Sequence, residues 1–260
     1  MSLLGIIASS KLGTPTAPVA GYTLWLDAAD TTTISLSGSG VTQWNDKSSN
    51  AFAFTQGTAA NRPQSGTQTI NSKNVLDFDG SNDFLTCTAA ASTFNYLHNS
   101  TGYTGFFAGQ YQTPTVVNIY YNTNQSNLAN IGASLYDNGA GVVSHDVARG
   151  VSGAANATSR GAAGSTITNG ANFYASVVID NTTATAADRV KIRINGGAES
   201  KTNTVTNAAS ASNASFALTL GTDGSIYTNM YYGEIIFYSG QLSDPDVASV
   251  NAYLSAKWGI

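Results

Sequence analysis

The stretch from Asn74 to Thr86, NVLDFDGSNDFLT, constrains the fold more than any other part of the chain. Apolar and polar side chains alternate through residues 75–79, which is the period of a half-buried β-strand. Asp79-Gly80 follows, and glycine readily takes the positive φ of a tight turn. A second apolar segment begins after the turn, so we predict a β-hairpin that anchors a hydrophobic core. The side chains predicted to form this anchor are Leu76, Phe78 and Phe84.

Similar β patterns recur along most of the chain. Residues 148–171 are different, because they are rich in small and polar residues, and we predict a long surface excursion there. At the end the period changes: Ser243 is a good N-cap, Pro245 lies in the first turn, and apolar residues recur at helical spacing. We therefore predict an all-β chain closed by one short helix at about 243–257. The other predicted strands are 22–27, a short strand at the start of 41–50, one that carries Phe52 and Phe54, and 103–111, 115–121, 129–136, 142–147, 173–179, 188–195, 216–220 and 231–238.

Composition excludes several classes of function. The 260 residues are 42% hydrophobic and only 10% charged, with a net charge of −4, and no region is strongly basic. The sequence therefore lacks the cluster of basic residues that is typical of nucleic-acid binding. A single cysteine, Cys87, excludes an intramolecular disulfide and a Cys-rich zinc site, and its strand context predicts a small buried hydrophobe. The chain has no run of about 18 apolar residues, the length that a transmembrane helix needs, so we expect no membrane partner.

Residues 1–20 are predicted to form an N-terminal arm and linker in front of one domain, 21–260. The short apolar run lacks the preceding positive charge of a signal peptide, so we interpret it as a mature N-terminus. Two interpretations stay open: a tail that is disordered or folded back, and a docking peptide that inserts into a partner. The aliphatic side chains that would dock are Leu3, Leu4, Ile6 and Ile7.

The clearest alternation in the chain is DRVKIRIN, residues 188–195. It predicts an exposed face that carries Arg189, Lys191 and Arg193. Such charges can keep an exposed strand from pairing with other chains. They could equally contact an anionic glycan or an acidic partner, and both interpretations stay open.

Catalysis has little support in the sequence. A retaining glycosidase needs two carboxyl groups about 5 Å apart, yet the only glutamates, Glu199 and Glu234, lie far apart in sequence. The two histidines, His98 and His145, are isolated, and we expect each on the surface or in a loop. Tyrosines and asparagines could supply a sugar site, but the sequence singles none out. The three tryptophans, Trp25, Trp44 and Trp258, have core patterns.

Calcium is the one metal with candidate ligands. Asp79, Asn82 and Asp83 place hard oxygen ligands in one turn. The alternative is that aspartate and asparagine are simply turn formers here, since three ligands fall short of the six to eight that Ca²⁺ takes. We therefore predict no cofactor, with calcium at this turn as the exception to test.

Several segments together resemble the concanavalin-A-like lectin/glucanase superfamily, in its laminin-G-like branch. They are LWLDAAD (24–30), WNDKSSN (44–50), VLDFDGSNDFL (75–85) and GEIIFYSGQLSDPDVASVNAYLSAKWGI (233–260). The resemblance implies a two-sheet antiparallel jelly-roll sandwich in which the terminal segments lie side by side. It also implies that Glu234 occupies a position found in non-catalytic relatives. The N-terminal MSLLGIIASSKLG is similar to short starts of tailed-phage virion proteins.

These observations predict a non-enzymatic surface protein of a tailed-phage virion. The arm would dock it to other virion proteins, and the lectin-like sandwich would serve as capsid decoration or as a fibre-like adhesin for cell-surface or environmental glycans. One alternative is a free-standing bacterial glycan-binding module, and another is a divergent glycosidase. The sequence does not specify an oligomeric state.

Overall fold

The computed structural model describes residues 19–99, 102–112, 117–151 and 157–260. The predicted docking side chains of the arm lie outside the described residues, so the docking interpretation stays a prediction.

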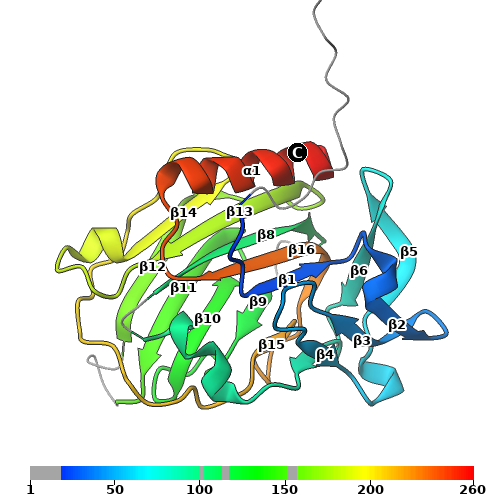
Figure 1. Cartoon of the computed structure of the whole chain (residues 1–260), viewed down its shortest axis with the longest axis horizontal. Coiled ribbons are helices and arrows are strands. Elements are labelled where there is room, and N and C mark those ends of the chain that lie inside the picture. The colour runs from blue at the N-terminus through cyan, green and yellow to red at the C-terminus, as the bar shows by residue number, and fades with distance from the viewer. Residues whose placement is uncertain (1–18, 100–101, 113–116, 152–156) are drawn as a thin grey trace, which may run out of the picture.

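The described chain is an antiparallel β-sandwich with one C-terminal α-helix (Figure 1). The strands are β1 (Leu24–Asp27), β2 (Ile34–Ser37), β3 (Gly40–Asn45), β4 (Ala53–Thr55), β5 (Gln64–Ile70), β6 (Lys73–Asp79), β7 (Leu85–Cys87), β8 (Tyr103–Tyr111), β9 (Ile119–Asn122), β10 (Ile131–Asp137), β11 (Val142–Arg149), β12 (Ala157–Thr166), β13 (Asn172–Ile179), β14 (Val190–Ile194), β15 (Thr219–Leu220) and β16 (Asn229–Ser239). The helices are α1 (Asp244–Trp258) and the 3-10 turns η1 (Thr31–Thr33), η2 (Ala59–Asn61), η3 (Ala91–Leu97) and η5 (Ala186–Arg189).

The strands follow one continuous hydrogen-bonded path that folds back on itself. Its order is β12-β11-β10-β9-β15-β7-β4-β3-β5-β6-β16-β8-β13-β14, with β1 added to β16 and β2 to β3. The two ends of the path meet, because a Cβ on Gly161 of β12 would lie 2.6 Å from the Val190 side chain of β14. The sheet therefore nearly closes into a sandwich. As the resemblance implied, the terminal segments lie side by side, with Leu24 opposite Phe237.

Two apolar layers hold the fold. The inner core fills the sandwich and contains fully buried Trp44, Phe54 and Phe107, while a second layer lies between the sheet and α1 and contains Phe106 and Trp258. Strands β8 and β16 are buried on both faces, and this explains why β16 is an apolar run without alternation. The predicted burial of Cys87 and the tryptophans is confirmed.

The helix is confirmed, with small changes at its ends. Ser243 is the N-cap and its hydroxyl accepts a hydrogen bond from the Asp246 backbone N–H at 3.3 Å. Gly259 closes the C-terminus at φ 70° in the left-handed conformation. Figure 1 shows α1 lying across the outer face of the sheet, beside β8 and β13.

The predicted hairpin at 74–86 is wrong in its pairing. The turn exists, and Gly80 has φ +78°. The strands on either side do not pair with each other: β6 pairs with β5 and β16, whereas β7 pairs with β4 and β15. The backbone N–H of Gly80 donates instead to Thr228 O at 3.0 Å. Residues 81–84 therefore carry the chain from one side of the sandwich to the other.

Two further predictions are corrected. Part of the predicted surface excursion is the strand β12, whose lack of large side chains suits its close approach to β14 at Gly161. His145 is fully buried in β11, so its predicted place on the surface or in a loop is wrong, whereas His98 is also fully buried but does lie in a turn, directly after η3. His145 Nε2 lies 2.9 Å from the Tyr121 hydroxyl inside the core, where burial lowers its pKa to about 3.

Candidate functional site

The most promising cavity opens on the outer face of the sheet, over β7, β15 and β9. It has a volume of about 350 Å³, at the lower end of the range for small-molecule sites. Its floor follows from strand alternation: Leu85 and Leu220 enter the inner core, so their neighbours Thr86 and Thr219 face outward. The Oγ1 atoms of these two threonines lie 3.3 Å apart on the cavity floor.

One wall is the turn that follows β9. The Asn122 side chain is only 2% exposed, and its Oδ1 accepts hydrogen bonds from the backbone N–H groups of Asn124 and Gln125. This arrangement holds Gln125 in the left-handed region at φ +52°. The Gln125 side chain is exposed and lines the cavity. Its planar amide is thus presented by a fixed turn, with a donor and an acceptor for a ligand.

The opposite wall is the loop 221–227. Asp223 is 8% exposed, and its Oδ1 accepts from the backbone N–H groups of Ser225 and Ile226 at 2.9 and 2.8 Å. The Thr222 hydroxyl closes the same loop by donating to Ile226 O at 2.6 Å. The Asp223 Oδ2 accepts no hydrogen bond from the described residues. The loop therefore holds a carboxylate at the cavity with one oxygen available.

Three aromatic rings come to this cavity from separate segments: Phe84, Phe216 and Tyr227. Phe216 is 36% exposed, and Phe84 and Tyr227 are half-buried. The predicted core role of Phe84 is therefore wrong, and so is the strand predicted to begin at Phe216. The strand begins only at Thr219, because the Phe216 backbone N–H bonds instead to Thr123 O at 3.1 Å. Sequence reasoning also missed Gln125, Asp223 and Tyr227.

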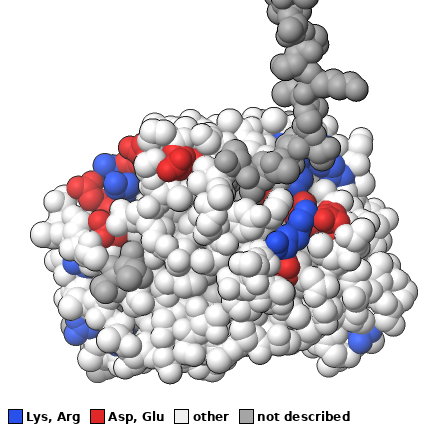
Figure 2. Space-filling view, viewed as in Figure 1, with Lys and Arg blue, Asp and Glu red and all other residues white. Residues whose placement is uncertain are grey.

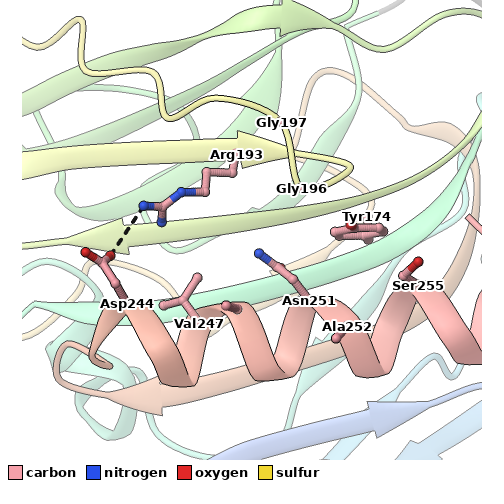
Figure 3. A pocket seen from close by; sticks show the side chains of 10 residues that line it. Tyr174, Arg193, Gly196, Gly197, Asp244, Val247, Asn251, Ala252 and Ser255 are labelled. Carbon is pink, nitrogen blue, oxygen red and sulfur yellow. Dashed lines mark hydrogen bonds and ion pairs between the residues drawn. The ribbon is translucent and has the colours of Figure 1, made fainter.

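The predicted basic face is only partly formed. Arg189 is 5% exposed, and its guanidinium donates to the backbone oxygens of Thr158 and Asn207. Its predicted outward position is therefore wrong. Lys191 and Arg193 do point outward on β14, but Arg193 Nη2 is paired with Glu199 at 2.6 Å and approaches Asp244 at 3.3 Å (Figure 3). Binding of an anionic partner stays a prediction for Lys191 and Arg193.

The predicted calcium turn is engaged in its own hydrogen bonds. Asp79 Oδ1 accepts from Ser81 N at 2.8 Å, and Asp83 Oδ2 accepts from Asp79 N at 3.1 Å. Asp83 is 3% exposed, and its burial raises its pKa to about 6. Asn82 is half-buried. Among the described residues, no three His, Cys, Asp or Glu side chains group as a metal site. Calcium binding at this turn stays a prediction.

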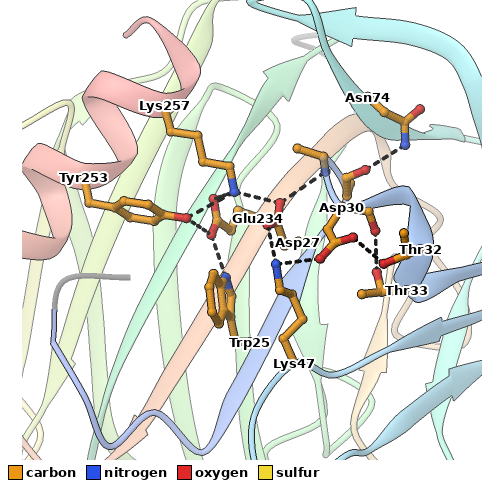
Figure 4. A network of polar contacts seen from close by, with 12 residues as sticks. Trp25, Asp27, Asp30, Thr32, Thr33, Lys47, Asn74, Glu234, Tyr253 and Lys257 are labelled. Carbon is orange, nitrogen blue, oxygen red and sulfur yellow. Dashed lines mark hydrogen bonds and ion pairs between the residues drawn. The ribbon is translucent and has the colours of Figure 1, made fainter. Parts of the chain in front are cut away.

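Glu234 lies at the centre of a buried polar network between α1 and the sheet (Figure 4). Its Oε1 accepts from Trp25 Nε1 and Tyr253 Oη, both at 2.7 Å, and its Oε2 accepts from Trp258 Nε1 and contacts Lys257 Nζ, both at 2.8 Å. Burial raises the pKa of Glu234, and Lys257 opposes that effect. The geometry assigns this carboxylate to holding the helix on the sheet.

The charged groups elsewhere are few. Figure 2 shows them in small mixed clusters on one face, separated by broad uncharged surface. No helix of the described residues has the length and apolarity needed to cross a membrane.

Comparison with solved structures identifies the class of fold. The chain is similar to the binding domain of botulinum neurotoxin DC in complex with SialylT (TM-score 0.57, 12% identity, 90% of this chain and 52% of that chain). It is also similar to the Trypanosoma rangeli sialidase (TM-score 0.59, 14% identity, 93% of this chain and 34% of that chain). The fold is thus an antiparallel jelly-roll sandwich with one C-terminal helix, as the sequence predicted.

These likenesses concern the fold alone. The chain spans about half the length of the toxin domain and a third of the sialidase. A third similar structure, of botulinum neurotoxin type C, carries the description that cell entry depends on interaction with two ganglioside molecules (TM-score 0.56, 12% identity, 90% of this chain and 51% of that chain). No family model and no curated protein sequence matches the chain.

Proposed function

We propose that this chain is a non-enzymatic glycan-binding module, and that the cavity over β7, β15 and β9 is its sugar site. The observation that carries the proposal is the meeting of three aromatic rings with the free oxygen of Asp223 and the amide of Gln125. Sugar rings present C–H faces that pack on aromatic side chains and hydroxyls that bond to carboxylates and amides. The fold shared with proteins described in complexes with SialylT and with sialic acid supports the same class.

The ligand we propose is a neutral sugar. Asp223 is the single charged side chain among the described residues that line the cavity. An acidic sugar would bring a second negative charge to a partly desolvated carboxylate, and like charges repel strongly where water is scarce. A neutral sugar can instead donate its hydroxyl hydrogens to Asp223. This chain would then differ in preference from the neighbours whose descriptions name sialic acid.

Binding to matched neutral and sialylated oligosaccharides tests this proposal. Titration calorimetry should show binding to a neutral member of the panel and none to its sialylated counterpart. Phe216→Ala should weaken that binding about tenfold, the equivalent of about 1.4 kcal/mol. Leu36→Ala is the matched control, because Leu36 is also exposed (48%) and apolar but lies outside the cavity. Equal affinity of both variants, or a preference for the sialylated sugar, would contradict the proposal.

For its biological setting, we propose that the module is displayed on a tailed-phage virion, with residues 1–20 as the docking arm. The support is the sequence resemblance of the N-terminal segment and the low charge of the chain. Deletion of residues 2–12 should leave a folded sandwich that no longer joins the particle. Assembly of the truncated protein would exclude docking by the arm. Absence of the full chain from purified particles would favour a free-standing bacterial module, and turnover of β-glucans would favour a glycosidase.

A further inference from the structure

A second cavity, of about 380 Å³, lies between α1 and the turn that follows β14 (Figure 3). It shares no lining residue with the cavity over β7, β15 and β9. The helix supplies one wall, and strand β14 with the bare backbone of Gly196 and Gly197 supplies the other. Gly196 is at φ +67°, and a Cβ there would lie 2.8 Å from the Tyr174 hydroxyl. The backbone of the turn thus approaches Tyr174 as closely as only glycine allows.

Arg193 gives this cavity hydrogen-bond donors without a free positive charge. Its Nη2 pairs with Glu199 Oε2 at 2.6 Å and with Asp244 Oδ1 at 3.3 Å. Two carboxylates therefore face one guanidinium, although Lys201 also contacts Glu199 at 2.9 Å. The Nε and Nη1 groups of Arg193 donate to no described residue. An anionic ligand gains little at such a site, whereas a neutral carbonyl oxygen can accept from the remaining donors.

Asn251 gives the cavity a buried acceptor that lacks a partner. This side chain is 7% exposed, and its Nδ2 donates to Ser176 Oγ at 3.4 Å. Its Oδ1 accepts no hydrogen bond from the described residues. Buried polar atoms are nearly always hydrogen-bonded, and one left without a partner destabilises the free protein. Figure 3 shows the amide rising from α1 between Arg193 and Tyr174, and because Oδ1 itself is buried, a ligand N–H in the cavity supplies the missing donor when the amide turns toward it.

The remaining helix wall is small and apolar. Val247, Ala248 and Ala252 line the cavity, and both alanines are exposed. They leave room beside the polar groups and offer a surface on which a methyl group can pack. The cavity thus combines carbonyl-binding donors, an acceptor for one N–H, and an apolar patch.

We propose that this cavity binds the acetamido group of a neutral N-acetylated amino sugar. Its carbonyl oxygen accepts from Arg193, its N–H donates to Asn251 Oδ1, and its methyl group packs on the alanines of α1. An acidic amino sugar is disfavoured, because its carboxylate would lie near Glu199 and Asp244. The proposal does not depend on the cavity over β7, β15 and β9, and it would give the module two separate sugar sites.

Residue-resolved NMR of the full ¹⁵N-labelled chain tests the proposal, with N-acetylglucosamine as the probe and glucose as its match without the acetamido group. N-acetylglucosamine should shift the backbone amides of 193–197 and 248–252 in a saturable manner, and glucose should not. Ala252→Leu fills the cavity and should weaken this binding about tenfold or more. Ala256→Leu is the matched control, because Ala256 is exposed on the same helix but outside the cavity, and it should bind as the native chain does.

The contrary outcomes are equally specific. Absence of saturable shifts at 193–197 and 248–252 would overturn the site, and equal shifts with glucose would overturn the acetamido preference. Equal weakening by Ala252→Leu and Ala256→Leu would also overturn it, because the effect would then come from the helix rather than from the cavity. Shifts at Thr219 and Gly224 report the other cavity in the same spectra, so the two proposals fail independently.

Discussion

At the scale of single residues, Asp137 should make stability depend on pH. It is fully buried, and its carboxylate accepts from the backbone N–H groups of Asn118 and Gly139 at 2.8 and 2.7 Å, with no Lys or Arg of the described residues paired to it. Burial raises its pKa to about 7, against about 4 in the unfolded chain. The folded state therefore holds the proton more tightly, so this contribution is present in full below about pH 4 and is lost as pH rises through 7.

Asp137→Asn removes that dependence, because the amide does not titrate. The variant should be less stable than the native chain at pH 5, since it loses an acceptor for one backbone N–H. The difference in unfolding free energy between the two proteins should narrow by roughly 2–3 kcal/mol by pH 8. Between pH 5 and the raised pKa, the unfolding free energy of the native chain falls by about 1.4 kcal/mol for each tenfold fall in proton concentration. Urea unfolding of both proteins from pH 5 to pH 8 measures it. A gap that stays constant over this range would contradict the raised pKa.

The sequence pattern around His145 indicates that this side chain is buried, whereas the pattern around Phe216 does not indicate that it is exposed. His145 stands two residues from Val143 and two from Val147 in β11, and all three side chains are fully buried. The pattern alone could have placed this histidine inside. Phe216 also alternates with Leu218 and Leu220, yet it is exposed. No local pattern reveals this, because the backbone there is held by Thr123 rather than by a strand neighbour.

At the scale of elements, prediction succeeded where large side chains mark the period. The strand 103–111 was predicted with the bounds it has, and so was the N-cap of α1. Strand β12 was missed because its sequence, ATSRGAAGST, is rich in glycine, alanine, serine and threonine, which are equally typical of loops. Its place is fixed by its partner β11 and by the close approach to β14, which are long-range contacts.

The attachment of α1 to the sheet should depend on the pairing of Glu234 with Lys257. Glu234→Gln leaves Asp27, at 2.7 Å, as the one carboxylate among the described residues that pairs with the buried Lys257, and it places an amide nitrogen among donors. Breaking a buried ion pair typically costs about 3–5 kcal/mol. We expect a loss of that order in chemical denaturation, together with faster amide hydrogen exchange throughout α1.

A double-mutant cycle with Lys257→Met separates the pairing from other effects. Met retains most of the apolar stem of lysine, so the double variant leaves neither charge unpaired. Its loss should be smaller than the sum of the two single losses by about 1 kcal/mol or more. Simple additivity would show that the network acts through packing rather than through the ion pair.

At the scale of the whole molecule, the candidate sugar site is a product of topology. Its walls come from residues 84–86, 122–125 and 216–227, which meet only because β15 lies between β7 and β9. The class of fold could be predicted from local patterns and from the resemblance at both ends of the chain. The pairing of β15 could not be predicted, because a strand of two residues is too short to show an alternation of apolar and polar side chains.

The near-closure of the sandwich leads to a last prediction. Gly161 of β12 faces Val190 of β14, and an added Cβ would lie 2.6 Å from one Val190 methyl group. Val190 is 1% exposed in the inner core, so it has little room to move away. Gly161→Ala should therefore push the two ends of the sheet apart and cost about 1–3 kcal/mol of unfolding free energy. Chemical denaturation measures this loss, and hydrogen exchange should show it concentrated in β12 and β14.

Gly57→Ala is the matched control, because Gly57 has no positive φ and a Cβ there meets nothing within 4 Å. It should be neutral or slightly stabilising, since alanine narrows the conformations of the unfolded chain. Adding Val190→Ala to Gly161→Ala removes the methyl group at 2.6 Å but leaves the Cβ of residue 190 at 2.8 Å. The double variant should therefore lose less stability than the sum of the two single losses, without full rescue. If the two losses simply add, the two ends of the sheet are not in contact, and the sandwich is more open than its strand order indicates.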